Sequence, residues 1–97
     1  MRNYELLFIA RPELDEEGLK ALIERVQQVI TANQGQIIKA EVMGRRKLAH
    51  MIAKRKEGYY VLVHAGLERA TITELERSLK LSEDVLRHML VRLDEVE

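Results

Sequence analysis

The chain has 97 residues, enough for one domain over residues 1–97 with a single hydrophobic core, and its high charged fraction is typical of a soluble globular protein. It contains no cysteine, which excludes disulfides, thiolate zinc sites and iron–sulfur clusters. No apolar run reaches the roughly 20 residues that a transmembrane helix needs. The formal net charge is zero, yet residues 39–58 carry seven basic and two acidic side chains, which points to a local binding site.

The first predicted elements are a strand and a helix. Alternating side chains predict a strand over residues 4–10, and Pro12 closes it. Asp15 is the expected N-cap of the helix, whose apolar residues recur at spacings of three and four. These residues are Leu19, Leu22, Ile23, Val26, Val29 and Ile30. Gly35 is expected to end the helix region by adopting a left-handed conformation.

The middle of the chain predicts two strands and the start of a second helix. The strands cover residues 36–43 and 59–65, and the segment 44–58 between them is bounded by glycines. Thr71 and Glu74 have the spacing of a capping box, in which each side chain bonds the other residue's backbone N–H. We therefore expect the second helix to begin at this pair.

A last strand completes the predicted fold. Leu75 and Leu79 face the core from the second helix, residues 85–93 form the strand, and the tail over residues 94–97 is short and acidic. The order β-α-β-β-α-β predicts an α+β, ferredoxin-like fold, a four-stranded antiparallel sheet with two helices on one face. The first and third strands would be central and apolar on both sides, so the uncovered face is a candidate protein- or RNA-binding surface.

The segment 44–58 holds six of the chain's sixteen Lys and Arg residues. They form two triplets around an apolar stretch, residues 48–53. The triplets are Arg45, Arg46 and Lys47, then Lys54, Arg55 and Lys56. This pattern indicates a positively charged hairpin suited to phosphate backbones. The alternative is a solvated hairpin whose charges only maintain solubility.

Several short motifs carry a resemblance to a known family. The chain opens with Met-Arg-Asn-Tyr-Glu and has Arg11-Pro12 before the first helix. The pattern Gly-x-Arg-x-Leu-Ala-Tyr-x-Ile-x-Lys is matched by Gly44, Arg46, Leu48, Ala49, Ile52 and Lys54, and the pattern x-Val-x-Arg-x-Met by Val85, Arg87 and Met89. Across its whole length the chain resembles the bacterial small-subunit ribosomal protein six family. His50 and Met51 depart from it, standing where Tyr and Pro are usual.

The resemblance implies a structural protein of the cytoplasmic ribosome, not an enzyme. It implies binding to the central domain of small-subunit ribosomal RNA as a heterodimer with small-subunit ribosomal protein eighteen, with no cofactor, membrane or small-molecule substrate. Four candidate RNA contacts match family motifs, namely Arg2, Arg46, Lys54 and Arg87. Four more rest on charge and proximity, namely Arg45, Arg55, Lys56 and Arg92. About five phosphate contacts would give a slope of log affinity against log salt of about −3.5 to −4.5.

Strand geometry limits how these residues can act. Tyr59 and Tyr60 are adjacent, so they point to opposite faces, and one of them is expected in the core. Arg87 and Arg92 should also lie on opposite faces. The three histidines are scattered, and neither a phosphate-cradling glycine loop nor a nucleophile–base pair is evident. A ferredoxin-like small-ligand regulatory module remains the alternative function.

Overall fold

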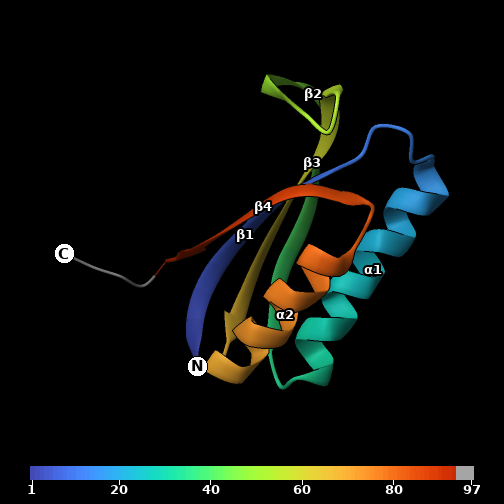
Figure 1. Ribbon diagram of the computed structural model, residues 1–97. Coiled ribbons are helices and arrows are strands. Elements are labelled where there is room, and N and C mark those ends of the chain that lie inside the picture. The colour runs from blue at the N-terminus through green and yellow to red at the C-terminus, as the bar shows by residue number, and fades with distance from the viewer. Residues whose placement is uncertain (94–97) are drawn as a thin grey trace.

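A computed structural model describes residues 1–93 of the chain as a two-layer α+β fold (Figure 1). The elements are β1 (Arg2–Ala10), α1 (Glu16–Ala32), β2 (Gln36–Ile52), β3 (Arg55–Leu67), α2 (Arg69–Leu81) and β4 (Val85–Arg92). Every strand pair is antiparallel and the order is β2-β3-β1-β4. The ferredoxin-like prediction is confirmed, with β1 and β3 central. The predicted acidic tail, residues 94–97, lies outside the described residues.

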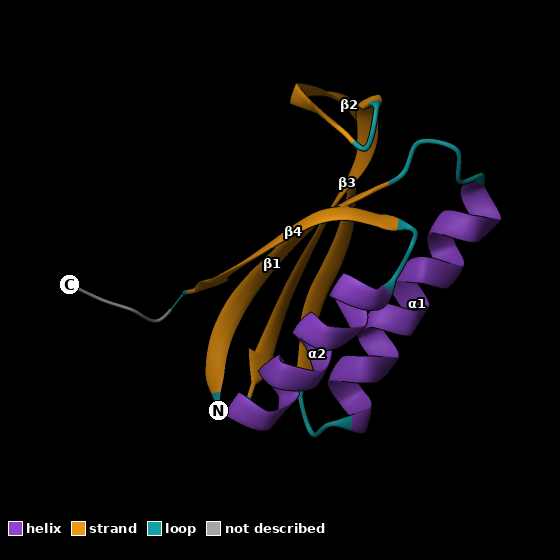
Figure 2. Cartoon of the chain, viewed as in Figure 1, coloured by secondary structure: helices purple, strands orange, loops and turns teal. Residues whose placement is uncertain are grey.

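The core lies between the sheet and the helices, which cover the same face (Figure 2). The α1 stripe is buried as its spacing predicts, at Leu19, Leu22, Val26 and Ile30. From α2 come Leu75 and Leu79, and from the central strands Leu6, Phe8, Val61 and Val63. Because neither α1 nor α2 packs on the other side, no helix of residues 1–93 covers the second face of the sheet, and we call it the open face.

The ends of α1 follow the prediction at one end only. Asp15 is the N-cap, and its carboxylate accepts a hydrogen bond of 2.7 Å from the Gly18 backbone N–H. At the C-terminal end the expected left-handed glycine is wrong, because Gln34 takes that conformation with φ 73°. Gly35 is needed for space: a Cβ there would lie 2.6 Å from Cγ2 of Ile30.

The predicted capping box of the second helix is wrong. Helix α2 begins at Arg69, with Glu68 as an N-cap that makes no side-chain cap hydrogen bond. Thr71 is fully buried inside the first turn, and its hydroxyl donates a 2.6 Å hydrogen bond to the Asn33 carbonyl. The hydroxyl thus ties α2 to the end of α1. The last strand, β4, ends at Arg92, one residue before the predicted limit.

The two middle strands are longer than predicted. Strand β2 continues to Ile52 and β3 already begins at Arg55, so the basic segment itself is β-structure. The residues between them, Ala53 and Lys54, both have positive φ, 51° and 65°, as a tight two-residue hairpin turn requires. The strands continue because Arg45, Arg46 and Lys47 pair with Tyr59, Gly58 and Glu57. The resulting hairpin extends beyond the helical layer (Figure 1).

Candidate nucleic-acid interface

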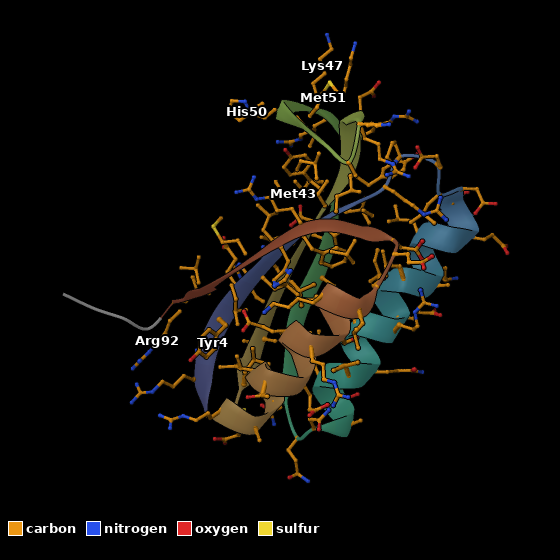
Figure 3. All side chains as sticks on the ribbon, viewed as in Figure 1. Tyr4, Met43, Lys47, His50, Met51 and Arg92 are labelled. Carbon is orange, nitrogen blue, oxygen red and sulfur yellow. The ribbon has the colours of Figure 1, made fainter. Side chains whose placement is uncertain are left out.

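The end of the β2–β3 hairpin is curled rather than straight. Lys47 pairs with Glu57 and Ile52 with Arg55, so residues 48–51 of β2 face only residue 56 of β3. Surplus residues on one strand bend a ribbon and turn its side chains. In Figure 3 the side chains of Lys47, His50 and Met51 lie at this far end and point in different directions. The tip can therefore present cations to more than one neighbouring phosphate.

Two of the six basic residues of segment 44–58 are already paired with carboxylates. The Arg45 Nε lies 2.9 Å from the Glu57 carboxylate, and this hydrogen bond raises the pKa of Arg45. The Arg55 Nε lies 3.0 and 3.1 Å from the two oxygens of Glu13. Although desolvation raises the pKa of Glu13, the hydrogen bond and charge of Arg55 lower it overall. A phosphate would have to compete with these carboxylates for both arginines.

The other four have no ion-pair partner among the described residues, and we call them the hairpin cations. They are Arg46, Lys47, Lys54 and Lys56, and all are exposed. The Arg46 guanidinium lies 5.9 Å from the centroid of the Tyr60 ring, close enough for a cation–π interaction, which restricts its position. Lys47 was absent from the candidates chosen by sequence, although its place in the first basic triplet was the available signal.

The remaining candidates lie elsewhere on the sheet. Arg2 pairs with Leu67, and Arg92 with Tyr4, at the end of the sheet opposite the hairpin, as Figure 3 shows for Tyr4 and Arg92. Nine residue steps of β3 separate this end from the residue beside Arg46, or about 30 Å at ~3.3 Å per residue. The eight candidates therefore do not form one continuous patch.

Arg87 and Arg92 lie on opposite faces, as predicted, with Arg87 on the open face and Arg92 on the helix-covered face. Arg87 pairs with Ile9, whereas Arg92 pairs with Tyr4, which packs against the core. Tyr59 packs against the core too, so the prediction that one of the adjacent tyrosines is a core residue is confirmed. Tyr60 contributes to the open face beside Ile9. Stacking of bases by both tyrosines is thus excluded.

The open face is partly apolar. Met89 and Val91 of β4 are 56% and 43% exposed, and Leu7 and Leu62 beside them are half-buried. Near its centre the ring Nε2 of His64 lies 2.9 Å from the Glu5 carboxylate. An apolar sheet surface with a few satisfied polar groups suits a protein partner.

Within residues 1–93, no three His, Asp or Glu side chains converge as metal ligands would. Neither α1 nor α2 is long and apolar enough to cross a membrane.

Comparisons with known proteins agree with the fold and with the resemblance found in the sequence. The family described as Ribosomal protein S6 matches residues 3–92. Small ribosomal subunit protein bS6 of Moorella thermoacetica is 43% identical over 95 residues, covering 98% of this chain and 97% of the relative. Its counterpart from an Exiguobacterium species is 50% identical over 92 residues, covering 95% and 97%.

The chain is also similar to solved structures, one of which belongs to the same family. The crystal structure of 30S ribosomal protein S6 from Thermotoga maritima superposes with a TM-score of 0.90 at 34% identity, covering 95% of this chain and 87% of that one. The C-terminal domain of the MgtC protein from Mycobacterium tuberculosis, at 14% identity and a TM-score of 0.68, shares the fold alone. The chain belongs to the bacterial ribosomal protein S6 family, the structural, non-enzymatic proteins of the small ribosomal subunit.

Proposed function

We propose that this chain binds the central domain of small-subunit ribosomal RNA as a heterodimer with small-subunit ribosomal protein eighteen. One observation carries the RNA-binding part: four exposed cations at the hairpin tip lack acidic partners in the described part of the chain. Membership of a ribosomal protein family argues against the alternative function, a ferredoxin-like small-ligand regulatory module.

Phosphate contacts by the hairpin cations account for binding without reading of bases. Arg46 can grip a phosphate with two parallel N–H groups, and its position over Tyr60 reduces the ordering needed on binding. The three lysines add mobile point charges. Each neutralised phosphate releases counterions, so these four contacts and one more from the remaining candidates, about five in total, give a slope of about −3.5 to −4.5.

A second polypeptide fits both the charge and the open face. The formal net charge of zero gives the whole protein no long-range attraction for RNA, so a basic partner that shares the site should raise the affinity. The exposed Met89 and Val91, with half-buried Leu7 and Leu62, offer that partner an apolar surface on the open sheet face. Burying it would stabilise a heterodimer.

The test is filter binding of a central-domain ribosomal RNA fragment across a salt series, with and without protein eighteen. We expect weak binding alone, tighter binding with the partner, and a slope of about −3.5 to −4.5. A slope near zero would contradict the phosphate contacts. RNA capture that is unaffected by protein eighteen would contradict the shared site.

A further inference from the structure

Beyond the body of the sheet, the β2–β3 hairpin is a ribbon of only two strands (Figure 1). Strand β1 pairs with β3 as far as Tyr59, which lies opposite Ala10, so within residues 1–93 no third strand pairs with residues 46–58. A two-stranded ribbon is only marginally stable on its own, so its direction needs support from another part of the molecule. That direction matters because this ribbon carries all four hairpin cations.

One ion pair ties the side chains of this ribbon to the body of the fold. The Arg55 Nε lies 3.0 and 3.1 Å from the two carboxylate oxygens of Glu13, in the loop between β1 and α1. The other arginines of the ribbon and its base bond within the hairpin. Arg45 donates to Glu57, and Arg46 donates to the Met43 carbonyl. Among the described residues, Glu13 is therefore the one hydrogen-bonding or ion-pair partner that the ribbon's side chains find outside the hairpin.

The loop that carries Glu13 is itself firmly attached. Leu14, the next residue, is buried in the core. On the other side of Pro12, the Arg11 Nε donates a 2.7 Å hydrogen bond to the Asp84 carboxylate, and the Arg11 backbone N–H donates a 2.9 Å bond to the Asp84 carbonyl. Proline also fixes one backbone dihedral of the loop. The Glu13 carboxylate is thus a fixed point to which the hairpin is attached next to its turn.

We propose that Glu13 is a positioning residue for RNA binding, which contacts no RNA itself and holds the hairpin, through Arg55, in the direction in which its cations meet the phosphates. The proposal rests on the proposed RNA-binding function. A carboxylate beside a phosphate-binding hairpin repels RNA by its charge, so its presence needs a compensating role. Holding the hairpin in its binding direction before RNA arrives is such a role, because it lowers the ordering cost of binding.

The experiment compares Glu13→Gln with the matched control Glu57→Gln. Each change removes one negative charge and frees one arginine, but Glu57 pairs with Arg45 inside the hairpin, whereas Glu13 joins the hairpin to the body. Affinity for the central-domain RNA fragment, with protein eighteen present, is measured across a salt series. We expect Glu13→Gln to bind about 3–10-fold more weakly, because binding must then order the released hairpin. Its slope should not become shallower, because no phosphate contact is lost. Glu57→Gln should bind at least as tightly as the unchanged protein.

Two further measurements separate positioning from a change in charge or in stability. Backbone order parameters of residues 46–57 in the free protein should fall in Glu13→Gln and remain unchanged in Glu57→Gln. The thermal unfolding midpoint of Glu13→Gln should stay close to that of the unchanged protein, because an exposed ion pair contributes little to stability.

The opposite results are equally clear. Equal or tighter RNA binding by Glu13→Gln, or an equal loss in Glu57→Gln, would overturn the positioning role, and so would unchanged order parameters in Glu13→Gln. In each case, weaker binding by Lys54→Gln with Lys56→Gln would leave the proposed function standing. A slope near zero in the unchanged protein would overturn both.

Discussion

The ion pairs of the hairpin predict that cations of equal charge contribute unequally to RNA binding. Lys54→Gln with Lys56→Gln removes two positive charges that have no acidic partner among the described residues. Arg45→Gln with Arg55→Gln also removes two, but Glu57 and Glu13 already neutralise them, at 2.9 and 3.0 Å. The two double variants are therefore matched in charge, place and number.

The expected magnitude follows from counterion release. Two lost phosphate contacts make the slope of log affinity against log salt shallower by about 1.4–1.8, a loss of about 25–60-fold at 0.1 M salt. The lysine pair should show this loss in filter binding with protein eighteen present. The arginine pair should lose clearly less, because carboxylates compete for those arginines before binding. If the arginine pair lost as much or more, the assignment of the hairpin cations would be wrong.

The remaining predictions concern stability and the partner surface. Leu75→Ala should lower the free energy of unfolding by about 2–5 kcal/mol, because this side chain is fully buried, and a loss below about 0.5 kcal/mol in urea unfolding would remove it from the core. Gly35→Ala should cost about 1–3 kcal/mol through its clash with Ile30, whereas Gln34→Gly should stabilise by up to about 1 kcal/mol by relieving a positive φ; thermal shifts of the same sign would refute this contrast. Met89→Lys should weaken capture of protein eighteen in a pull-down and leave the fold intact, and undiminished capture would exclude Met89 from the partner surface.

The predictable part of the fold follows from local periodicity. Leu19 to Ile30 lie on one face of α1 because a helix repeats every 3.6 residues, and the same rule places Leu75 and Leu79 in the core. Adjacent Tyr59 and Tyr60 separate to opposite faces because strand side chains alternate. These features need no knowledge of distant contacts.

The features that sequence reasoning missed depend on contacts between distant residues. Thr71 has a capping-box spacing, but its hydroxyl donates to Asn33, 38 positions earlier. Thr71 instead lies inside α2, which begins at Arg69. Likewise, Arg55 pairs with Glu13, 42 positions away, which composition alone cannot reveal.

The candidate site was also predictable where it depends on local sequence, and not where it depends on contacts between distant residues. The basic triplets made the hairpin visible from sequence, and its projection from the body of the fold agrees with that interpretation. The ion pair of Arg45 could not be predicted from sequence, because Arg45 meets Glu57 only through the register of β2 with β3. Likewise, Arg92 lies beside Tyr4 only because β1 pairs with β4.

Charge reversal at the hairpin tests the central claim most directly. Arg46→Glu with Lys54→Glu replaces two hairpin cations, and Lys20→Glu with Lys80→Glu makes the same charge change at exposed positions on α1 and α2. Incorporation into reconstituted small-subunit particles would be measured for both, after circular dichroism confirms folding. We predict that the hairpin variant fails to incorporate while the helix variant incorporates normally. Normal incorporation of the folded hairpin variant would contradict the proposal that this hairpin holds ribosomal RNA.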